Sequence, residues 1–148
     1  MKIDRRSVLH SLLAVAATLV LPRILFAARD EKAFAATTAD EAIAELLGAT
    51  PTDSDRVQMK IPDIAENGAV VPVTIKTDLA DVESISVVVD NNPTPLAASF
   101  DMSSNTVAVI SVRIKMGQSS KVRAIVKAGG DLYSTTKEVK VTIGGCGG

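Results

Sequence analysis

The sequence predicts an all-β domain: an immunoglobulin-like antiparallel β-sandwich with a short N-terminal helix and a flexible C-terminal tail. Valine, isoleucine and threonine are abundant while aromatic residues make up only 3%, and β-branched residues favour strands. From residue 57 onward, apolar and polar residues alternate with period two, which is typical of strands with one buried face. Six or seven such runs follow one another at short spacing, separated by turn signals, and this arrangement favours a sandwich.

The first 28 residues have the features of an export signal. Arg5 and Arg6 form a basic start, and the apolar run 11–21 that follows is too short to span a bilayer comfortably. Small-residue sites at 25–28 and 33–35 place the expected cleavage between residues 27 and 35. The paired arginines favour the twin-arginine route, although Val8 stands where that motif usually has phenylalanine. We expect a periplasmic protein that is free of the membrane after cleavage; an uncleaved anchor is the alternative.

A short helix is expected at the start of the predicted domain, which we place at residues 37–143. Thr38 and Glu41 have the spacing of a capping box, and Gly48 is suited to a helix end. The residues that share the apolar face between them are Ile43, Leu46 and Leu47. A polar link, 49–55, leads to the first strand.

The strands are expected where the alternation is clearest: 57–61, 71–75, 85–89, 96–102, 107–114, 122–126 and 139–143. Asn67-Gly68 and Gly129-Gly130 are turn signals, the second of them a two-residue hairpin. Pro72 lacks an N–H and therefore indicates an edge strand or a strand end. The apolar phase shifts by one residue between 107–109 and 110–114, which predicts a bulge.

The most informative motif follows the last strand. Cys146, the single cysteine, stands between Gly144, Gly145, Gly147 and Gly148. Glycine loses the most freedom on ordering, so we expect 144–148 to be a swinging arm that can place the thiol in a narrow pocket of another protein. A thiolate is a nucleophile and can hold sulfur as a persulfide or thiosulfonate. The alternatives are an incidental or dimer-forming thiol and a glycine-rich end without function.

Other constellations indicate solvated surface. The only histidine, His10, lies in the leader, and no phosphate-binding loop is present in the sequence, so an enzyme is not expected. The mature chain is acidic and poor in aromatics, which argues against nucleic-acid binding. Two acidic pairs are expected to be turns without metal: Asp53 with Asp55, and Asp81 with Glu83. Three cations on one outward strand face favour a solvated face over an anion-attracting patch: Lys121, Arg123 and Lys127.

Three stretches resemble the SoxY family, the carrier subunit of bacterial thiosulfate oxidation. The stretch 141–148, Val-Thr-Ile-Gly-Gly-Cys-Gly-Gly, is similar to the terminal signature of that family. The stretch 61–73 is similar to an early segment of the family, and 90–95, leading to Phe100, to its mid-chain loop. The likeness covers roughly residues 37–148.

The resemblance implies a carrier without activity or cofactor of its own, which holds sulfur covalently on Cys146. It implies a heterodimer with a SoxZ-like β-sandwich subunit. A SoxAX-like c-type cytochrome would conjugate thiosulfate to the thiol, and a SoxB-like thiohydrolase would release sulfate. In some organisms a sulfane dehydrogenase would oxidise the remaining sulfur.

Two other functions fit parts of the sequence. An exported adhesive or structural sandwich would carry Cys146 incidentally and would keep its function without residues 144–148. A cytoplasmic carrier that is activated as a thiocarboxylate also ends in Gly-Gly, but the export signal and Cys146 both argue against it.

Overall fold

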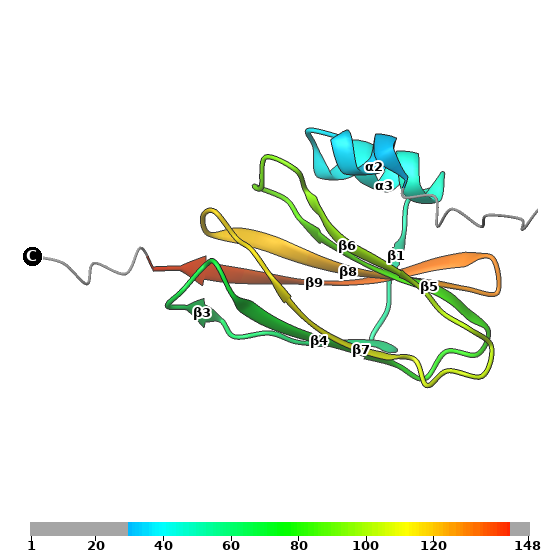
Figure 1. The fold of residues 1–148 in the computed structure, drawn as a ribbon. Helices are drawn as coiled ribbons and strands as arrows, with labels where there is room; N and C mark the ends of the chain where they lie inside the picture. Colours follow the sequence, from blue (N-terminus) through cyan, green and yellow to red (C-terminus); the bar gives the residue numbers. More distant parts are fainter. Residues whose placement is uncertain (1–29, 143–148) are drawn as a thin grey trace, which may run out of the picture.

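The computed structural model describes residues 30–142 and confirms the predicted β-sandwich (Figure 1). The larger sheet has the strand order β1-β9-β8-β5-β6, and the smaller sheet has the order β2-β4-β7. The strands of the larger sheet are β1 (Thr52–Asp53), β5 (Val82–Val89), β6 (Leu96–Asp101), β8 (Ser120–Ala128) and β9 (Asp131–Val141). Those of the smaller sheet are β2 (Val57–Lys60), β4 (Val71–Thr77) and β7 (Val109–Ile114). A further short strand, β3 (Ile64–Ala65), pairs with β9.

The main core lies between the two sheets. It is built from the inward residues that the alternation predicted, with Ile75 of β4, Ile85 of β5 and Val126 of β8 fully buried. Sheet residues of this kind stabilise the fold mainly through the apolar area they remove from water. The seven longer strands match the six or seven expected, and they pair antiparallel.

Helices cover part of the outer face of the larger sheet, so β5, β6 and β8 are buried on both sides where they lie beneath the helices (Figure 1). Val88 of β5 and Ile125 of β8 point outward from the sandwich and pack beneath the helices α2 (Glu31–Ala35) and α3 (Ala39–Leu47). The expected helix is α3: Thr38 Oγ1 accepts from the Glu41 N–H at 3.2 Å, and Gly48 ends the helix at φ 72°. The sequence pattern does not predict helix α2, which packs against the predicted domain from before residue 37.

The turn between β8 and β9 is confirmed as a two-residue hairpin. Ala128 pairs with Asp131, and the two glycines between them have φ values of 58° and 86°. Positive φ at both positions is the requirement of the type I′ turn, which is why glycine occurs twice. Asn67-Gly68 also lies in a turn, in which Asn67 Oδ1 accepts from the Ala69 N–H at 2.9 Å. That turn, however, belongs to the longer connection between β2 and β4.

Pro72 lies at a strand end, one of the two positions expected for it: it is the second residue of β4, which is the middle strand of its sheet and not an edge. Pro72 is tolerated because β2 pairs with β4 only from Thr74 onward, so the missing N–H lies beyond the end of β2. The prediction of a bulge inside β7 is wrong. The phase shift arises just before the strand, where the Val109 N–H bonds the Val107 carbonyl at 2.7 Å, and the pairing of β4 with β7 is continuous.

Candidate functional site

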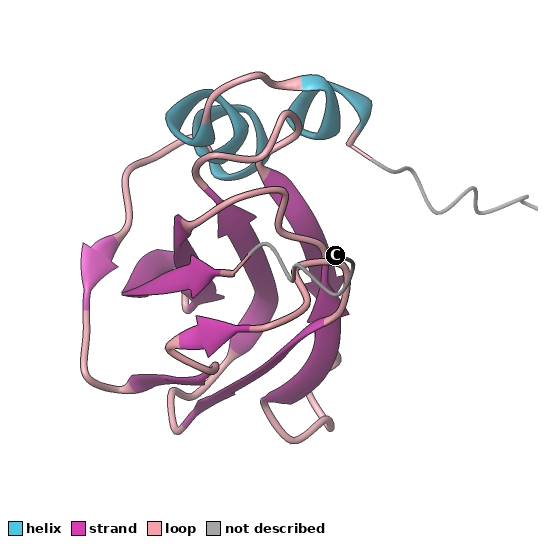
Figure 2. Ribbon diagram, turned by 90° about the vertical axis from the view of Figure 1, so that its left-hand side faces the viewer, coloured by secondary structure: helices cyan, strands magenta, loops and turns pink. Residues whose placement is uncertain are grey.

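The candidate site is the end of the sandwich at which β9 finishes, because the chain continues from there toward Cys146. Cys146 and the four arm glycines lie outside the described residues, and the described part of the site is the base from which they follow. Figure 2 views the molecule from this end, with the helices over one face. Three loops lie at this end: 61–70 bonds Thr142, 115–119 bonds Val141, and 90–95 is bonded to 115–119. We call them together the exit surface.

The last residues of β9 are held on both edges. On one edge, β3 pairs parallel to β9, and the Lys140 and Thr142 N–H groups donate to the Asp63 and Ala65 carbonyls at 2.9 and 3.1 Å. On the other edge, β8 begins at Ser120 opposite Val139, so Val141 lies beyond it, and the Val141 N–H donates instead to Ser119 Oγ at 2.9 Å. The backbone is therefore fixed as far as Thr142, and Cys146 follows four positions further along the chain.

The other two loops of the exit surface are joined by side-chain amides. Asn91 donates from Nδ2 to the Ser119 carbonyl at 2.9 Å. Asn92 donates to the Lys115 carbonyl at 2.7 Å and accepts from the Gly117 N–H at 3.1 Å. The structure thus brings together two stretches that the sequence analysis singled out separately, 61–70 and 90–95. It adds a third, 115–119, for which the sequence carries no signal.

Gly68 brings two of these loops into close approach. Its carbonyl accepts from the Met116 N–H at 2.7 Å. A Cβ on Gly68 would lie 2.3 Å from the Met116 carbonyl oxygen and 2.9 Å from Val141 Cγ1. The absence of a side chain at residue 68 therefore sets the spacing between the loops and the end of β9.

We expect Ser119→Ala to loosen the base of the arm. The variant leaves the Val141 N–H without its acceptor, and a hydrogen bond of this kind contributes about 1 kcal/mol net. Hydrogen exchange at the Val141 amide should therefore accelerate roughly fivefold, while the Lys140 and Thr142 amides, bonded to β3 and its flank, serve as internal controls. Ser104→Ala, in the loop before β7, should change none of these rates. Unchanged exchange at Val141 would show that Ser119 does not hold the strand.

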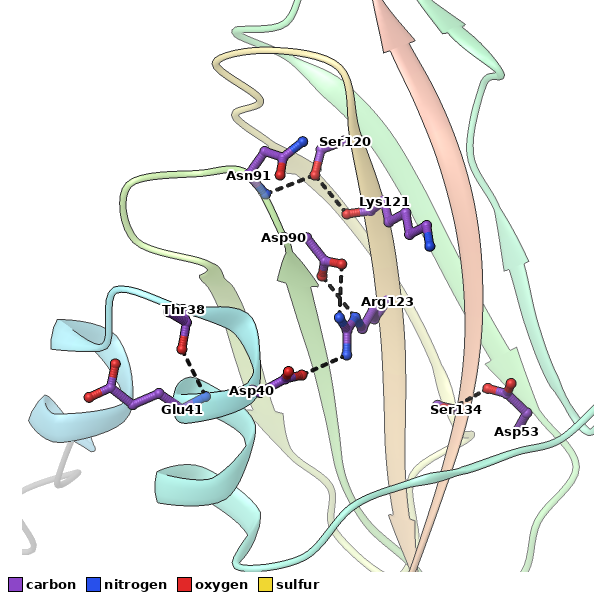
Figure 3. Close-up of polar contacts among 10 residues, drawn as sticks. All are labelled: Thr38, Asp40, Glu41, Asp53, Asp90, Asn91, Ser120, Lys121, Arg123 and Ser134. Carbon is purple, nitrogen blue, oxygen red and sulfur yellow. Dashed lines mark hydrogen bonds and ion pairs between the residues drawn. The ribbon is translucent and has the colours of Figure 1, made fainter.

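The predicted cation face on β8 is used in ion pairs (Figure 3). Arg123 Nη2 donates to Asp90 Oδ2 at 2.9 Å, and Nη1 donates to Asp40 Oδ1 of α3 at 3.0 Å. Arg123 Nε lies 2.8 Å from Asp90 Oδ1 as an ion pair without hydrogen-bond geometry. The hydrogen bond to Asp90 raises the pKa of the Arg123 guanidinium above its ordinary value. This cluster joins helix α3 to the start of the 90–95 loop.

The acidic pairs have structural roles, but Asp53 and Glu83 lie in strands β1 and β5 and not in turns. Asp53 Oδ1 accepts from the Ser134 hydroxyl at 2.8 Å and fixes β1 against β9 (Figure 3). Glu83 contacts Lys127 at 2.7 Å and accepts from the Gly130 N–H, and these hydrogen bonds lower the pKa of its carboxyl. Asp81 occupies a turn at φ 52°. With Arg123 and Lys127 both paired, the solvated-face interpretation is favoured over an anion patch.

Two hollows of the described surface are lined by charges of both signs and do not single out a ligand. A cleft of about 740 Å³ between α3 and the larger sheet is lined by both signs of charge, Asp40 and Asp53 against Lys121 and Arg123. A smaller hollow of about 340 Å³ beside Ser119 has the same mixture, with Asp90, Lys121 and Glu138. Over residues 30–142 no group of three potential metal ligands is found. Within the same range no helix is long and apolar enough to cross a membrane.

Comparisons with known proteins agree with this fold and with the resemblance. The family model "SoxY: Sulfur oxidation protein SoxY" matches residues 43–146. The structure of the sulfur carrier protein SoxY from Chlorobium limicola f thiosulfatophilum is 42% identical in sequence, with a TM-score of 0.64, and the match covers 70% of this chain and 96% of that one. A comparison with curated protein sequences gave no match.

A more distant likeness concerns the fold alone. Superoxide reductase (neelaredoxin) from Ignicoccus hospitalis matches with a TM-score of 0.53 at 13% identity, and the match covers 58% of this chain and 80% of that one. A single-residue variant of the same reductase matches at 14% identity with the same TM-score, over 70% and 91% of the two chains. Sequence identity this low supports a shared sandwich architecture and nothing about chemistry.

Proposed function

Because the chain belongs to the SoxY family of sulfur oxidation proteins, which are non-catalytic sulfur carriers, we propose that it carries thiosulfate-derived sulfur on Cys146. The observation that carries this proposal is the extent of the family match, which runs through the sandwich and ends at Cys146. Cys146 is the only thiol of the chain, so sulfur held through a thiol has one possible site.

The proposed chemistry needs only a thiolate from this chain. In conjugation, the Cys146 thiolate forms an S–S bond with the outer sulfur of thiosulfate, and two electrons pass to the conjugating cytochrome. Hydrolysis then consumes one water, releases sulfate and two protons, and leaves the persulfide anion on Cys146. The glycines 144, 145, 147 and 148 add no bulk beside the sulfur, so the arm can enter a narrow pocket. Residues 144–148 are proposed as the swinging arm of the carrier.

The proposal includes export and partners. We place the signal peptide at residues 1–28, with the twin-arginine route to the periplasm. Ala33 and Ala36 are buried against the sheet, which favours cleavage near Ala28 over cleavage after Ala35, since the latter would remove α2. The proposed partners are a SoxZ-like subunit, a SoxAX-like cytochrome, a SoxB-like thiohydrolase and, in some organisms, a sulfane dehydrogenase.

Mass spectrometry of the native protein tests these points together. Protein purified from thiosulfate-grown cells should carry extra mass that a reductant removes, and peptide mapping should place that mass on Cys146. The reduced chain should have a mature start before Glu31. Under native conditions it should remain bound to a second small protein. A chain that gains no reductant-labile mass, or that keeps its function after deletion of residues 144–148, would instead fit a structural or adhesive protein.

A further inference from the structure

Two apolar side chains are exposed on the exit surface. Ile64 of β3 is 58% exposed and Val70, just before β4, is 50% exposed. Both lie on the 61–70 loop, and Ile64 pairs with Lys140, two residues before the end of the described chain. The same loop also exposes three polar residues: Asp63, Glu66 and Asn67. Exposed apolar side chains accompanied by polar ones are the usual composition of a protein interface.

The length of the arm limits how far from Ile64 and Val70 an enzyme can bind Cys146. The backbone is fixed at Thr142 by its hydrogen bond to Ala65, and four residues can extend at most about 14 Å. An enzyme that takes the sulfur of Cys146 into a pocket must therefore bring the rim of that pocket close to Thr142. Loop 61–70 holds Thr142 and also carries Ile64 and Val70. Docking therefore brings the rim of the enzyme's pocket to this loop.

We propose that Ile64 and Val70 form a shared docking contact for the enzymes that load and unload Cys146, and that each such enzyme meets them with an apolar pocket rim. The inference rests on the proposed carrier function. Two half-exposed side chains offer far less area than the roughly 800 Å² that each partner of a stable complex buries. A small contact suits a carrier that must leave each enzyme after one transfer.

The chain offers a matched control at the other end of the sandwich. Val107 is 77% exposed and Val109 is 41% exposed. Val109 pairs with Lys76, and Val71, at the start of β4, pairs with Ile114 at the exit end, so β4 and β7 separate the two apolar pairs along their length. Serine at either pair removes exposed apolar surface without opening the core.

The test compares the double variant Ile64→Ser/Val70→Ser with Val107→Ser/Val109→Ser in the full mature chain with its partner subunit. The rate of thiosulfate conjugation to Cys146 by the conjugating enzyme is measured by intact mass. We expect the exit-side variant to raise the KM for the carrier roughly tenfold with kcat unchanged, and the control to match wild type. Both should react with a small alkylating agent at the wild-type rate, because the thiol itself is untouched.

Four results would overturn the inference. A wild-type KM in the exit-side variant, with normal loading of the wild type, removes the docking role and leaves the carrier function intact. An equal effect of both double variants would mean that the loss is not specific to the exit surface. Loss of the partner subunit in native mass spectrometry would assign the pair to the permanent interface. If the wild type itself is never loaded on Cys146, the carrier function fails first and the docking role fails with it.

Discussion

Cys146→Ser is expected to abolish sulfur loading completely. Serine has nearly the same size, but its oxygen forms no persulfide or thiosulfonate, and its pKa leaves no nucleophilic anion near neutral pH. The substitution replaces one sulfur atom by oxygen in a segment that otherwise consists of glycines, so the melting temperature should not change. The measurement is intact mass after incubation with thiosulfate and the conjugating enzyme. If the serine variant still gains mass that a reductant removes, sulfur is held elsewhere.

The arm glycines provide the matched control for that experiment. Gly145→Val and Gly147→Val keep the thiol and should react normally with a small alkylating agent. Conjugation by the enzyme should nevertheless slow, because β-branched side chains widen and stiffen the segment beside the sulfur. If both valine variants load at the wild-type rate, the glycines are not needed for entry into the pocket.

Much of the fold could be predicted because its strands have one strongly buried face. The alternation in β4, β5 and β8 encodes the sandwich core directly, and the glycine pair at 129–130 encodes its hairpin. Strand β9 was predicted only from residue 139, because its first eight residues do not alternate regularly between buried and exposed. Helix α2 and strands β1 and β3 were missed because they span five, two and two residues. Segments this short have no period to detect, and their positions are set by contacts with the sheet.

The candidate site divides in the same way. The arm could be predicted because the reactivity of a thiol and the small size of glycine are properties of the residue types and do not depend on contacts in the folded chain. The exit surface could not, because Ser119 and Asn91 act through hydrogen bonds to residues 22 and 28 positions away. The cations of β8 show the same limit. The alternation of the sequence predicts that Arg123 points outward, but only the folded chain shows that Asp40 and Asp90 pair with it.

Gly68 is needed for a reason other than the turn that the sequence predicted. Asn67-Gly68 predicted a turn, and a turn is present. The described glycines with positive φ are Gly48, Gly129 and Gly130, so Gly68 is not required for its backbone conformation. It is required because the Met116 carbonyl and Val141 occupy the space that a side chain would fill.

Gly68→Ala is therefore expected to destabilise the domain by about 2–3 kcal/mol, the typical cost of overpacking a close contact. The nearest atom, at 2.3 Å from the new Cβ, is a backbone oxygen that cannot rotate away, so the 61–70 loop must move outward. That movement breaks the hydrogen bond from Met116 to Gly68 and disturbs Val141 at the base of the arm. For a domain of this size the melting temperature should fall by roughly 10 °C.

Gly117→Ala is the matched control for Gly68→Ala, because it lies in the neighbouring loop of the same surface. Its Cβ would meet only Asn92 Oδ1, at 4.0 Å, and its N–H bond to that atom is kept. We expect a change within about 0.5 kcal/mol, as for most exposed substitutions. Thermal unfolding of the two variants beside wild type gives the comparison. Equal stability of both would mean that the loops can separate freely, and that the end of β9 is held by β3 and Ser119 without the close approach at Gly68.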